Sequence, residues 1–499
     1  MSALGKFPRA ITAVSGGRRL ILGAALLAVA LPLALPLHRG AGSYPVAAVL
    51  VCVAAIGYFV WTLPPALTIT AGVVLSPLAS NWRLLGVPGS ASPDRLLLVA
   101  GISVVLCRGP GARALPRLRI RPTHAVLGLL LVYAVISAAA SKTLLHHVGF
   151  FRLFDAFGVL PFLIFLVAPI VFHDTRTRSV LLAGVVGLGA YLGLTAIFEA
   201  AKLSSLVFPH YIVTSTATDR TGRAYGAFLE PVSNGVGLFY CGVAAVVAFV
   251  TWRRRSARTF AALAATVCAA GVFFTLERSV WLGAGIALVV VVGAAVPRLK
   301  RWAPRVASTA ALIVAAAAVT GTALLFVPGL AHKAHHRATD QATVWDRQNL
   351  ATAAENMIEA RPLLGFGWSR FEQSSLEYFR QNANYPLDPH LAFDPGSQGT
   401  FSVHNEFLDY AVTLGLVGTA VWLLGLALAL GGALRAHGPP DLEHWRFGLL
   451  PVAVFYIVIE NAVPPALFPN LVLWLWLGVV WAGYRAPGIS PAARAVQDP

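Results

Sequence analysis

The chain has 499 residues, of which 57% are hydrophobic and only 12% are charged. A soluble domain carries about twice that share of charged residues, so the composition excludes an ordinary soluble enzyme. Lysine and arginine outnumber the acidic residues, 38 to 21, and the net charge is +17. These basic residues lie mostly in short hydrophilic gaps between apolar segments, as membrane topology requires. We therefore expect a lipid bilayer, and no nucleic acid, as partner.

Repeated apolar segments of about 18–22 residues predict a polytopic membrane protein. Because backbone in lipid must satisfy its hydrogen bonds internally, the predicted fold is an all-α bundle. Pro64-Pro65 lies between the second and third segments, which could therefore form one broken element. About fourteen membrane-spanning segments are predicted, at residues 20–37, 45–62, 65–80, 94–107, 123–140, 156–172, 179–199, 229–250, 259–276, 279–296, 306–327, 405–433, 447–463 and 467–484.

The positions of lysine and arginine predict the orientation in the cytoplasmic membrane. Placing the N-terminus inside puts the most basic short gaps inside, and an even number of segments returns the C-terminus to the same side. Two long outer segments, about 200–228 and 328–402, also carry lysine and arginine. Long loops cross the membrane regardless of their charge. We therefore expect the positive charges of these two segments to serve a function at the extracytoplasmic face. The predicted division is into N-terminal helices (1–199), helices with outer arginine motifs (200–327), a long extracytoplasmic loop (328–402) and C-terminal helices (403–499).

The first outer motif contains Arg223 between two glycines, Gly222 and Gly226, just before an apolar segment. The glycines permit tight backbone turns. Arg223 is either an interfacial side chain that extends toward water or part of a shaped binding loop. The neighbouring Gly, Pro and Asn residues favour the loop.

The second motif, Glu277-Arg278, joins two apolar segments with almost no loop, which places Arg278 at or below the outer interface. An arginine within the membrane costs about 2.5–3.5 kcal/mol on insertion scales, so it needs a partner. Glu277 is the local candidate, and an anionic ligand is the alternative. A guanidinium suits phosphate because it stays charged and donates two parallel hydrogen bonds.

The long outer loop contains a third pattern. Leu350, Ala354, Met357 and Ile358 recur at helical spacing, which predicts an amphipathic helix lying along the membrane face. Pro362 and the following Gly365-Phe366-Gly367 end this helix. Residues 382–399 are rich in Pro, Asp, Asn and Gly, which is typical of a mobile lid or an acceptor-side loop.

The fourth motif is a polar cluster, His404-Asn405-Glu406 with Asp409, at the start of an apolar segment. Polar groups at such a depth cost free energy unless they are paired or used. A lone interfacial histidine often serves in packing, but this one closes the largest outer loop on the face that carries the outer arginines. Neutral imidazole can accept a hydroxyl proton near neutral pH. We expect His404 to be catalytic and either Glu406 or Asp409 to orient it.

Signals for other chemistries are missing from the sequence. It contains no P-loop, dinucleotide-binding or HExxH motif, and the predicted first outer loop, 38–44, has no carboxylate for a metal. Cys52, Cys107, Cys241 and Cys268 lack metal-binding spacing and are interpreted as small hydrophobes. Glu199 and the pair Glu460-Asn461 either line a cavity or, as we favour, form hydrogen bonds between helices. We expect neither a metal nor another cofactor.

In these motifs the chain resembles the O-antigen ligase and O-antigen polymerase superfamily of polytopic bacterial membrane glycosyltransferases. The resemblance covers about 220–420, and the N-terminal half matches only in being polytopic. It implies a GT-C-like bundle of about twelve transmembrane helices, and together with the fourteen apolar segments we expect about 12–14. The passages that carry it are Gly222-Arg223 with Gly226 and Asn234; Arg278-Ser279; Arg347 with Arg361-Pro362-Leu363-Leu364-Gly365-Phe366-Gly367; and His404-Asn405-Glu406-Phe407-Leu408-Asp409-Tyr410 with Leu414-Gly415-Leu416-Val417-Gly418.

The resemblance implies transfer of a glycan from a polyprenyl pyrophosphate carrier of the undecaprenyl type to a hydroxyl of a polysaccharide or glycolipid acceptor. Carried over, Arg223 and Arg278 would hold the pyrophosphate while His404 acts as base, and the anomeric carbon would be inverted. Fixed guanidinium charge would replace a metal. Both ligation and polymerisation fit the motifs. Candidate contacts to acceptor or donor are Arg347, Arg361, Arg370 and Asn405.

The competing hypothesis is a transporter or flippase for a lipid-linked glycan, which also needs many helices and an anion site. Transporters commonly show internal repeats and polar groups near the membrane midplane. The sequence shows no convincing repeat, and its polar cluster is predicted at one surface. A scaffold without chemistry would leave the buried arginines unexplained, so a glycosyltransferase is favoured.

Overall fold

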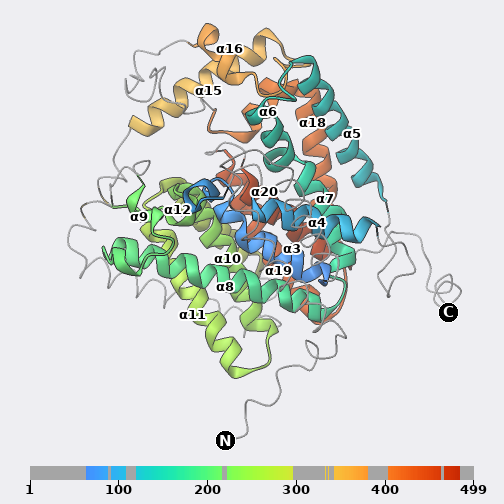
Figure 1. Cartoon of the computed structure of the whole chain (residues 1–499). Helices are drawn as coiled ribbons and strands as arrows, with labels where there is room; N and C mark the ends of the chain where they lie inside the picture. The colour runs from blue at the N-terminus through green and yellow to red at the C-terminus, as the bar shows by residue number, and fades with distance from the viewer. Residues whose placement is uncertain are drawn as a thin grey trace, which may run out of the picture.

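The computed structural model describes residues 63–87, 92–107, 120–215, 222–295, 342–379, 403–461 and 466–483, together with residues 332 and 335. These described residues form helices and connecting turns, without a strand. Figure 1 shows the helices gathered into one bundle. The predicted all-α polytopic membrane protein is therefore confirmed.

Most of the predicted membrane segments correspond to helices. Three of the fourteen (20–37, 45–62 and 306–327) lie outside the described residues, and each of the other eleven coincides with a helix. Seven helices in the described part are long and apolar enough to cross a membrane. Six of them are α5 (Pro122–Ala140), α8 (Thr175–Ala200), α10 (Pro231–Thr251), α11 (Arg255–Phe274), α18 (Glu406–Leu434) and α19 (Pro440–Ile459). The seventh is the segment Val148–Val171, in which α6 (His147–Phe151), η4 (Arg152–Phe157) and α7 (Val159–Val171) follow one another with a bend at Gly158.

The remaining predicted segments form shorter helices. α3 (Pro65–Leu75) has 11 residues and begins directly after Pro64, so the proline pair marks a helix start. α4 (Pro93–Cys107) has 15 residues and packs against α3. A straight helix needs about 20 residues to cross the hydrocarbon, so neither is a complete span by itself. α12 (Arg278–Ala295) and α20 (Leu467–Trp481) are also below that length.

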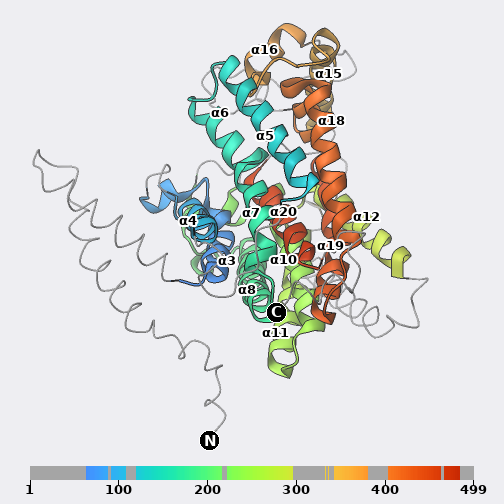
Figure 2. The same cartoon turned by 90° about the vertical axis from the view of Figure 1, so that its right-hand side faces the viewer.

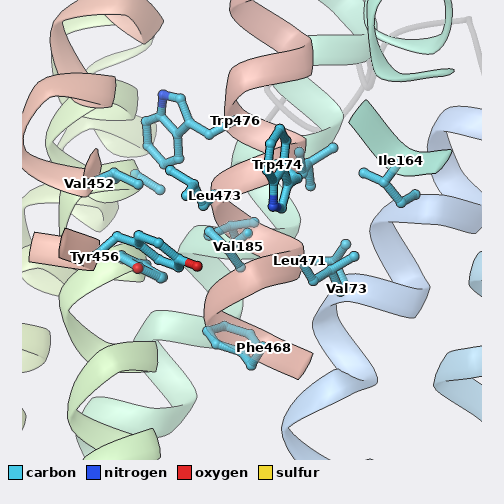
Figure 3. Close-up of a cluster of buried hydrophobic side chains, with 14 of the residues drawn as sticks. Val73, Ile164, Val185, Val452, Tyr456, Phe468, Leu471, Leu473, Trp474 and Trp476 are labelled. Carbon is cyan, nitrogen blue, oxygen red and sulfur yellow. The ribbon is translucent and has the colours of Figure 1, made fainter. Parts of the chain in front are cut away.

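Helix α20 is enclosed by the other helices. Its residues from Phe468 to Trp481 are all buried, as expected of a helix that is hydrophobic on every side. Figure 3 shows its side chains among those of neighbouring helices, with Val73 of α3 and Val452 of α19 nearby. The Trp474 ring packs edge-on against Phe162 and Phe165 of α7, with centroids 4.9 and 5.4 Å apart. This packing fixes the ends of the helices that carry the site.

Helix α18 is broken near its start. Gly415 has a φ of 69°, which no helix interior adopts, and separates residues 406–414 from residues 416–434. The rings of Phe407 and Tyr410 both lie against Trp422, with centroids 5.4 and 5.0 Å apart. In a straight helix Phe407 and Trp422 would be about 22 Å apart. The first half of α18 therefore folds back along the second.

The segment that follows α15 (Ala342–Ala360) is hydrogen-bonded into this break. The amides of Phe366 and Gly367 donate to the carbonyls of Val412 and Thr413, at 2.8 and 3.1 Å, which the break leaves without helical partners. The amide of Leu416 donates in turn to the carbonyl of Pro362 at 2.8 Å. Two of the motifs that predict the family thus meet as one structural unit.

Helices α15 and α16 (Phe371–Tyr378) lie at one end of the bundle, beside the upper ends of α5 and α18 in Figure 1 and above these helices in Figure 2. The predicted helix in the long loop is therefore present. Its apolar face was expected along the membrane, but Ala354 and Met357 are fully buried against Phe371 and Val412. That expectation is wrong for these residues because α16 and α18 cover the face. We call α15, α16 and the segment between them the cap.

Candidate functional site

The segment around Arg223 is held by a buried carboxylate of α8. The two oxygens of Glu199 accept hydrogen bonds from the backbone amides of Tyr225 and Gly226, both at 2.9 Å. A carboxylate that accepts consecutive amides fixes the backbone between them. Gly222 and Gly226 have φ angles of 79° and 57°, as the predicted tight turns require. Glu199, interpreted from the sequence as a helix–helix contact, positions the arginine loop instead.

Further side chains hold the same loop. Asn234 of α10 donates to the carbonyl of Ala224 at 3.1 Å. Asn81 and Tyr211 both donate to the carbonyl of Ala227, each at 2.9 Å. Asn81 and Tyr211 were not singled out from the sequence, because nothing in their local pattern indicates a contact with residues far along the chain. The loop has little freedom to move as a result.

Glu277 joins the two predicted arginine motifs. Nη1 of Arg223 lies 2.8 Å from Oε1 of Glu277, and both side chains are largely buried. Glu277 immediately precedes Arg278, the first residue of α12. The partner expected for Arg278 therefore pairs with the arginine of the other motif.

Arg347 brings the cap into this group. Its side chain is half-buried on α15, and burial lowers its pKa. The carboxylates of Glu277 and Glu230 raise the pKa of Arg347. The positive charges of Arg278 and Arg223 lower it further. The other four charged groups therefore lie within electrostatic range of Arg347. We call Arg223, Glu230, Glu277, Arg278 and Arg347 the arginine cluster; its formal charge is +1.

His404 lies beside the arginine cluster. Burial, and after it the positive charge of Arg347, lowers the pKa of His404 from 6.5 to about 4, so the imidazole is neutral at pH 7. The residue has a φ of 50°, a left-handed conformation that is uncommon outside glycine. Asn405 follows as the N-cap of α18, with its side-chain oxygen accepting from the amide of Leu408 at 3.1 Å. The N-cap residue Asn405 thus fixes the start of α18, directly after His404.

The structure gives Glu406 partners other than His404. Its carboxylate is fully buried and accepts hydrogen bonds from the hydroxyl of Tyr410, from Tyr456 at 2.8 Å and from Asn470 at 3.2 Å. The backbone amide of Glu406 donates to the carbonyl of Glu460 at 2.7 Å. Glu406 therefore ties the start of α18 to α19 and α20, and the expectation that it orients the imidazole has no support in these contacts.

Asp409 is likewise directed into the protein. Its carboxylate is almost completely buried and pairs with the guanidinium of Arg152, from the π-helical turn Arg152–Phe157. Glu406 and Asp409 are three residues apart and share one helical face, which is turned to the core. His404 precedes the helix and does not share that face. The role expected of Asp409 as an alternative orienting group is not supported either.

Two of the candidate contact arginines serve in the cap. The guanidinium of Arg361 lies 4.7 Å from the ring centroid of Phe366. Arg370 donates to the side chain of Gln373 and to the carbonyl of Ser141, which links α16 to the end of α5. Of the predicted contact residues, Arg347 is the one placed by electrostatics in the arginine cluster. Within the described part of the chain, no three His, Cys, Asp or Glu side chains are grouped as for a metal ion.

This fold and site define a polytopic membrane protein with a cationic cluster and a neutral histidine under a helical cap. Residues 263–423, 161 of the 499, match the family model described as O-antigen ligase. The predicted resemblance to the O-antigen ligase superfamily of glycosyltransferases is thus confirmed. The matched region contains Arg278, Arg347 and His404, whereas Arg223 precedes it. A comparison with curated proteins finds no significant match.

Proposed function

We propose that the protein transfers a glycan from a polyprenyl pyrophosphate carrier to an acceptor hydroxyl at the extracytoplasmic face of the cytoplasmic membrane. The observation that carries the proposal is the meeting of four separated segments. Arg223, Arg278 and Arg347 lie in one electrostatic cluster, and His404 lies beside Arg347. The match to the O-antigen ligase family supports the same class of reaction.

In the proposed reaction the arginine cluster binds the pyrophosphate of the donor. Fixed guanidinium groups stabilise negative charge without reorganising, so they favour departure of the carrier. The acceptor oxygen forms a bond to the anomeric carbon as the bond from that carbon to the phosphate oxygen breaks. The electron pair leaves with the polyprenyl pyrophosphate, and the acceptor proton passes to His404. Attack opposite the leaving group inverts the anomeric carbon.

Burial and the charge of Arg347 keep His404 neutral but make it a weak base. Binding of a pyrophosphate would offset the charge of Arg347 and so raise the pKa of His404 toward its ordinary value. Donor binding would therefore prepare the base for the second substrate. In this proposal Glu406 and Asp409 act as positioning residues, through the hydrogen bonds that hold the first half of α18.

The proposal is tested by His404→Ala and Arg278→Ala in protein reconstituted with a lipid-linked glycan and an acceptor. Loss of the general base is expected to lower kcat by about 10²–10⁴-fold. Loss of one charged contact to the pyrophosphate is expected to lower kcat/KM by about ten- to a hundredfold. The exposed Arg253, at the opposite end of α10, provides the matched control in Arg253→Ala.

Retention of transfer by both site variants would overturn the mechanism. The size of the products separates the two remaining forms of the activity, since a ladder indicates polymerisation and a single conjugate indicates ligation. Movement of the lipid-linked glycan across the bilayer of a sealed vesicle, without transfer, would favour a flippase.

A further inference from the structure

The cap exposes two leucines at its tip. Leu363 and Leu364, in the turn between α15 and α16, are each 65% exposed. The apolar face of α15 itself is buried on protein, so these leucines are a separate apolar feature of the cap. Both follow Pro362 in the segment that is hydrogen-bonded into the break of α18.

The tip is held in a fixed place beside the second half of α18. The amide of Val417 donates to the carbonyl of Leu363, and that of Leu416 donates to the carbonyl of Pro362. A Cβ added to Gly415 would lie 2.2 Å from the carbonyl oxygen of Leu363, so the two backbones touch. The leucines therefore cannot withdraw from the surface of α18 without breaking this contact.

That surface continues the lipid-facing side of a membrane helix. Leu416 and Val417 are 48% and 46% exposed, and Leu423 and Leu424 are exposed two turns further along. Residues seven apart lie on one face of a helix. An exposed apolar stripe on a membrane-spanning helix faces lipid, and the leucine tip adjoins its outer end.

The length of α18 places the tip at the membrane boundary. Its second half, from residue 416 to residue 434, has 19 residues and is about 28 Å long. This matches the thickness of the hydrocarbon core, about 30 Å. The start of this half, and with it the leucine tip, therefore lies where the acyl chains of the outer leaflet end.

We propose that Leu363 and Leu364 insert among the acyl chains of the outer leaflet and anchor the cap to the membrane. The partner is the lipid surface itself. Because the anchored turn directly follows α15, it also sets the height of Arg347 above the membrane. The proposal concerns the cap and holds whatever group the arginine cluster binds.

The test measures the environment of spin labels at Leu364→Cys and Leu363→Cys. The full chain, carrying Cys52→Ser and Cys107→Ser, is placed in phosphatidylethanolamine–phosphatidylglycerol nanodiscs, with the buried Cys241 and Cys268 left in place. For each spin label, the rate of collision with oxygen is compared with the rate of collision with a water-soluble nickel chelate. Leu424→Cys is the lipid-facing control and Glu359→Cys, exposed on α15, is the water-facing control.

Labels at positions 363 and 364 are expected to collide with oxygen and to be shielded from nickel, as at Leu424→Cys. Nickel accessibility at both positions equal to that at Glu359→Cys would overturn the proposal.

Discussion

The imidazole of His404 is neutral at pH 7 because its burial and the charge of Arg347 both disfavour protonation. Its left-handed backbone lies between Val403, which is buried against the cap, and Asn405, the N-cap of α18. A single residue thus combines an uncommon conformation with a strongly shifted pKa. Such a combination is frequent at functional sites.

This environment predicts the pH dependence of transfer. His404 can accept a proton only when neutral, so activity is present above its pKa and is lost as the pH falls through it. We expect the acidic limb of kcat/KM for the donor, which reports the free enzyme, near pH 4. The limb of kcat should lie at higher pH, because the bound pyrophosphate offsets Arg347.

Arg347→Gln provides the control for this assignment. Removing the positive charge should move the limb of kcat/KM to higher pH, because one of the two causes of the lowered pKa is gone. Steady-state rates from about pH 3 to pH 8 measure both limbs, since the lower limb is expected near pH 4. An acidic limb of kcat/KM at the ordinary pKa of histidine, both in the unsubstituted enzyme and in Arg347→Gln, would contradict the role of Arg347.

Glu199 is predicted to act through Arg223. Glu199→Gln replaces one acceptor oxygen by an amide donor, which would face the backbone N–H of Tyr225 or Gly226. A buried donor left without an acceptor costs about 1–3 kcal/mol. We expect the KM for the donor to rise while the KM for the acceptor stays unchanged.

Glu355→Gln, at an exposed position on α15, is the matched control for Glu199→Gln. A purely structural role for Glu199 predicts a lower melting temperature with both KM values unchanged. That outcome would remove Glu199 from the binding of the donor.

At the scale of elements, the break in α18 is the feature that organises the cap. Gly365 and Gly415 have φ angles of 69° each, and a Cβ on either would lie within 2.7 Å of backbone atoms of the opposite segment. Only glycine fits this approach without displacement. His404 lies just before the first half of α18, so the break also affects where the imidazole lies.

Gly415→Ala is therefore expected to destabilise the junction between the cap and α18. The new methyl group would collide with the carbonyl of Leu363, and alanine would have to adopt a positive φ. We expect a lower melting temperature and reduced transfer, measured in the same detergent or lipid. The control is Gly431→Ala on the same helix, where a Cβ meets nothing within 4 Å and helix propensity improves by about 1 kcal/mol. Equal stability of the two variants would contradict the proposed junction.

At the scale of the whole molecule, the site is assembled from segments that are distant in the sequence. Glu199 of α8, Arg223, the pair Glu277-Arg278, Arg347 of the cap and His404 each come from a different segment. The buried helix α20 supports this arrangement, because Asn470 near its start binds Glu406 of α18. Packing of the helix ends brings these residues to one end of the bundle.

Much of this could be predicted from the sequence by local physics. The apolar segments of the sequence predict eleven of the described helices, because a helix in lipid needs apolar side chains along most of its length. Arg223, Arg278, Arg347 and His404 were recognisable because charged and titratable groups near lipid need a partner or a use. The roles of Glu406 and Asp409 were not recognisable from the sequence. The side of a helix that faces the core depends on the neighbouring helices, and the local sequence pattern does not identify them.

The sequence by itself determined the class of the molecule: an all-α membrane protein whose polar motifs, in order along the chain, resemble those of the O-antigen ligases. The tertiary structure alone decided which of those motifs meet. It paired Arg223 with Glu277, placed Arg347 between the arginines and His404, and inserted the cap into the break of α18. The physical reason is that the hydropathy of a segment predicts whether that segment forms a membrane helix. Which charged and hydrogen-bonding groups meet depends instead on how the helices pack against one another.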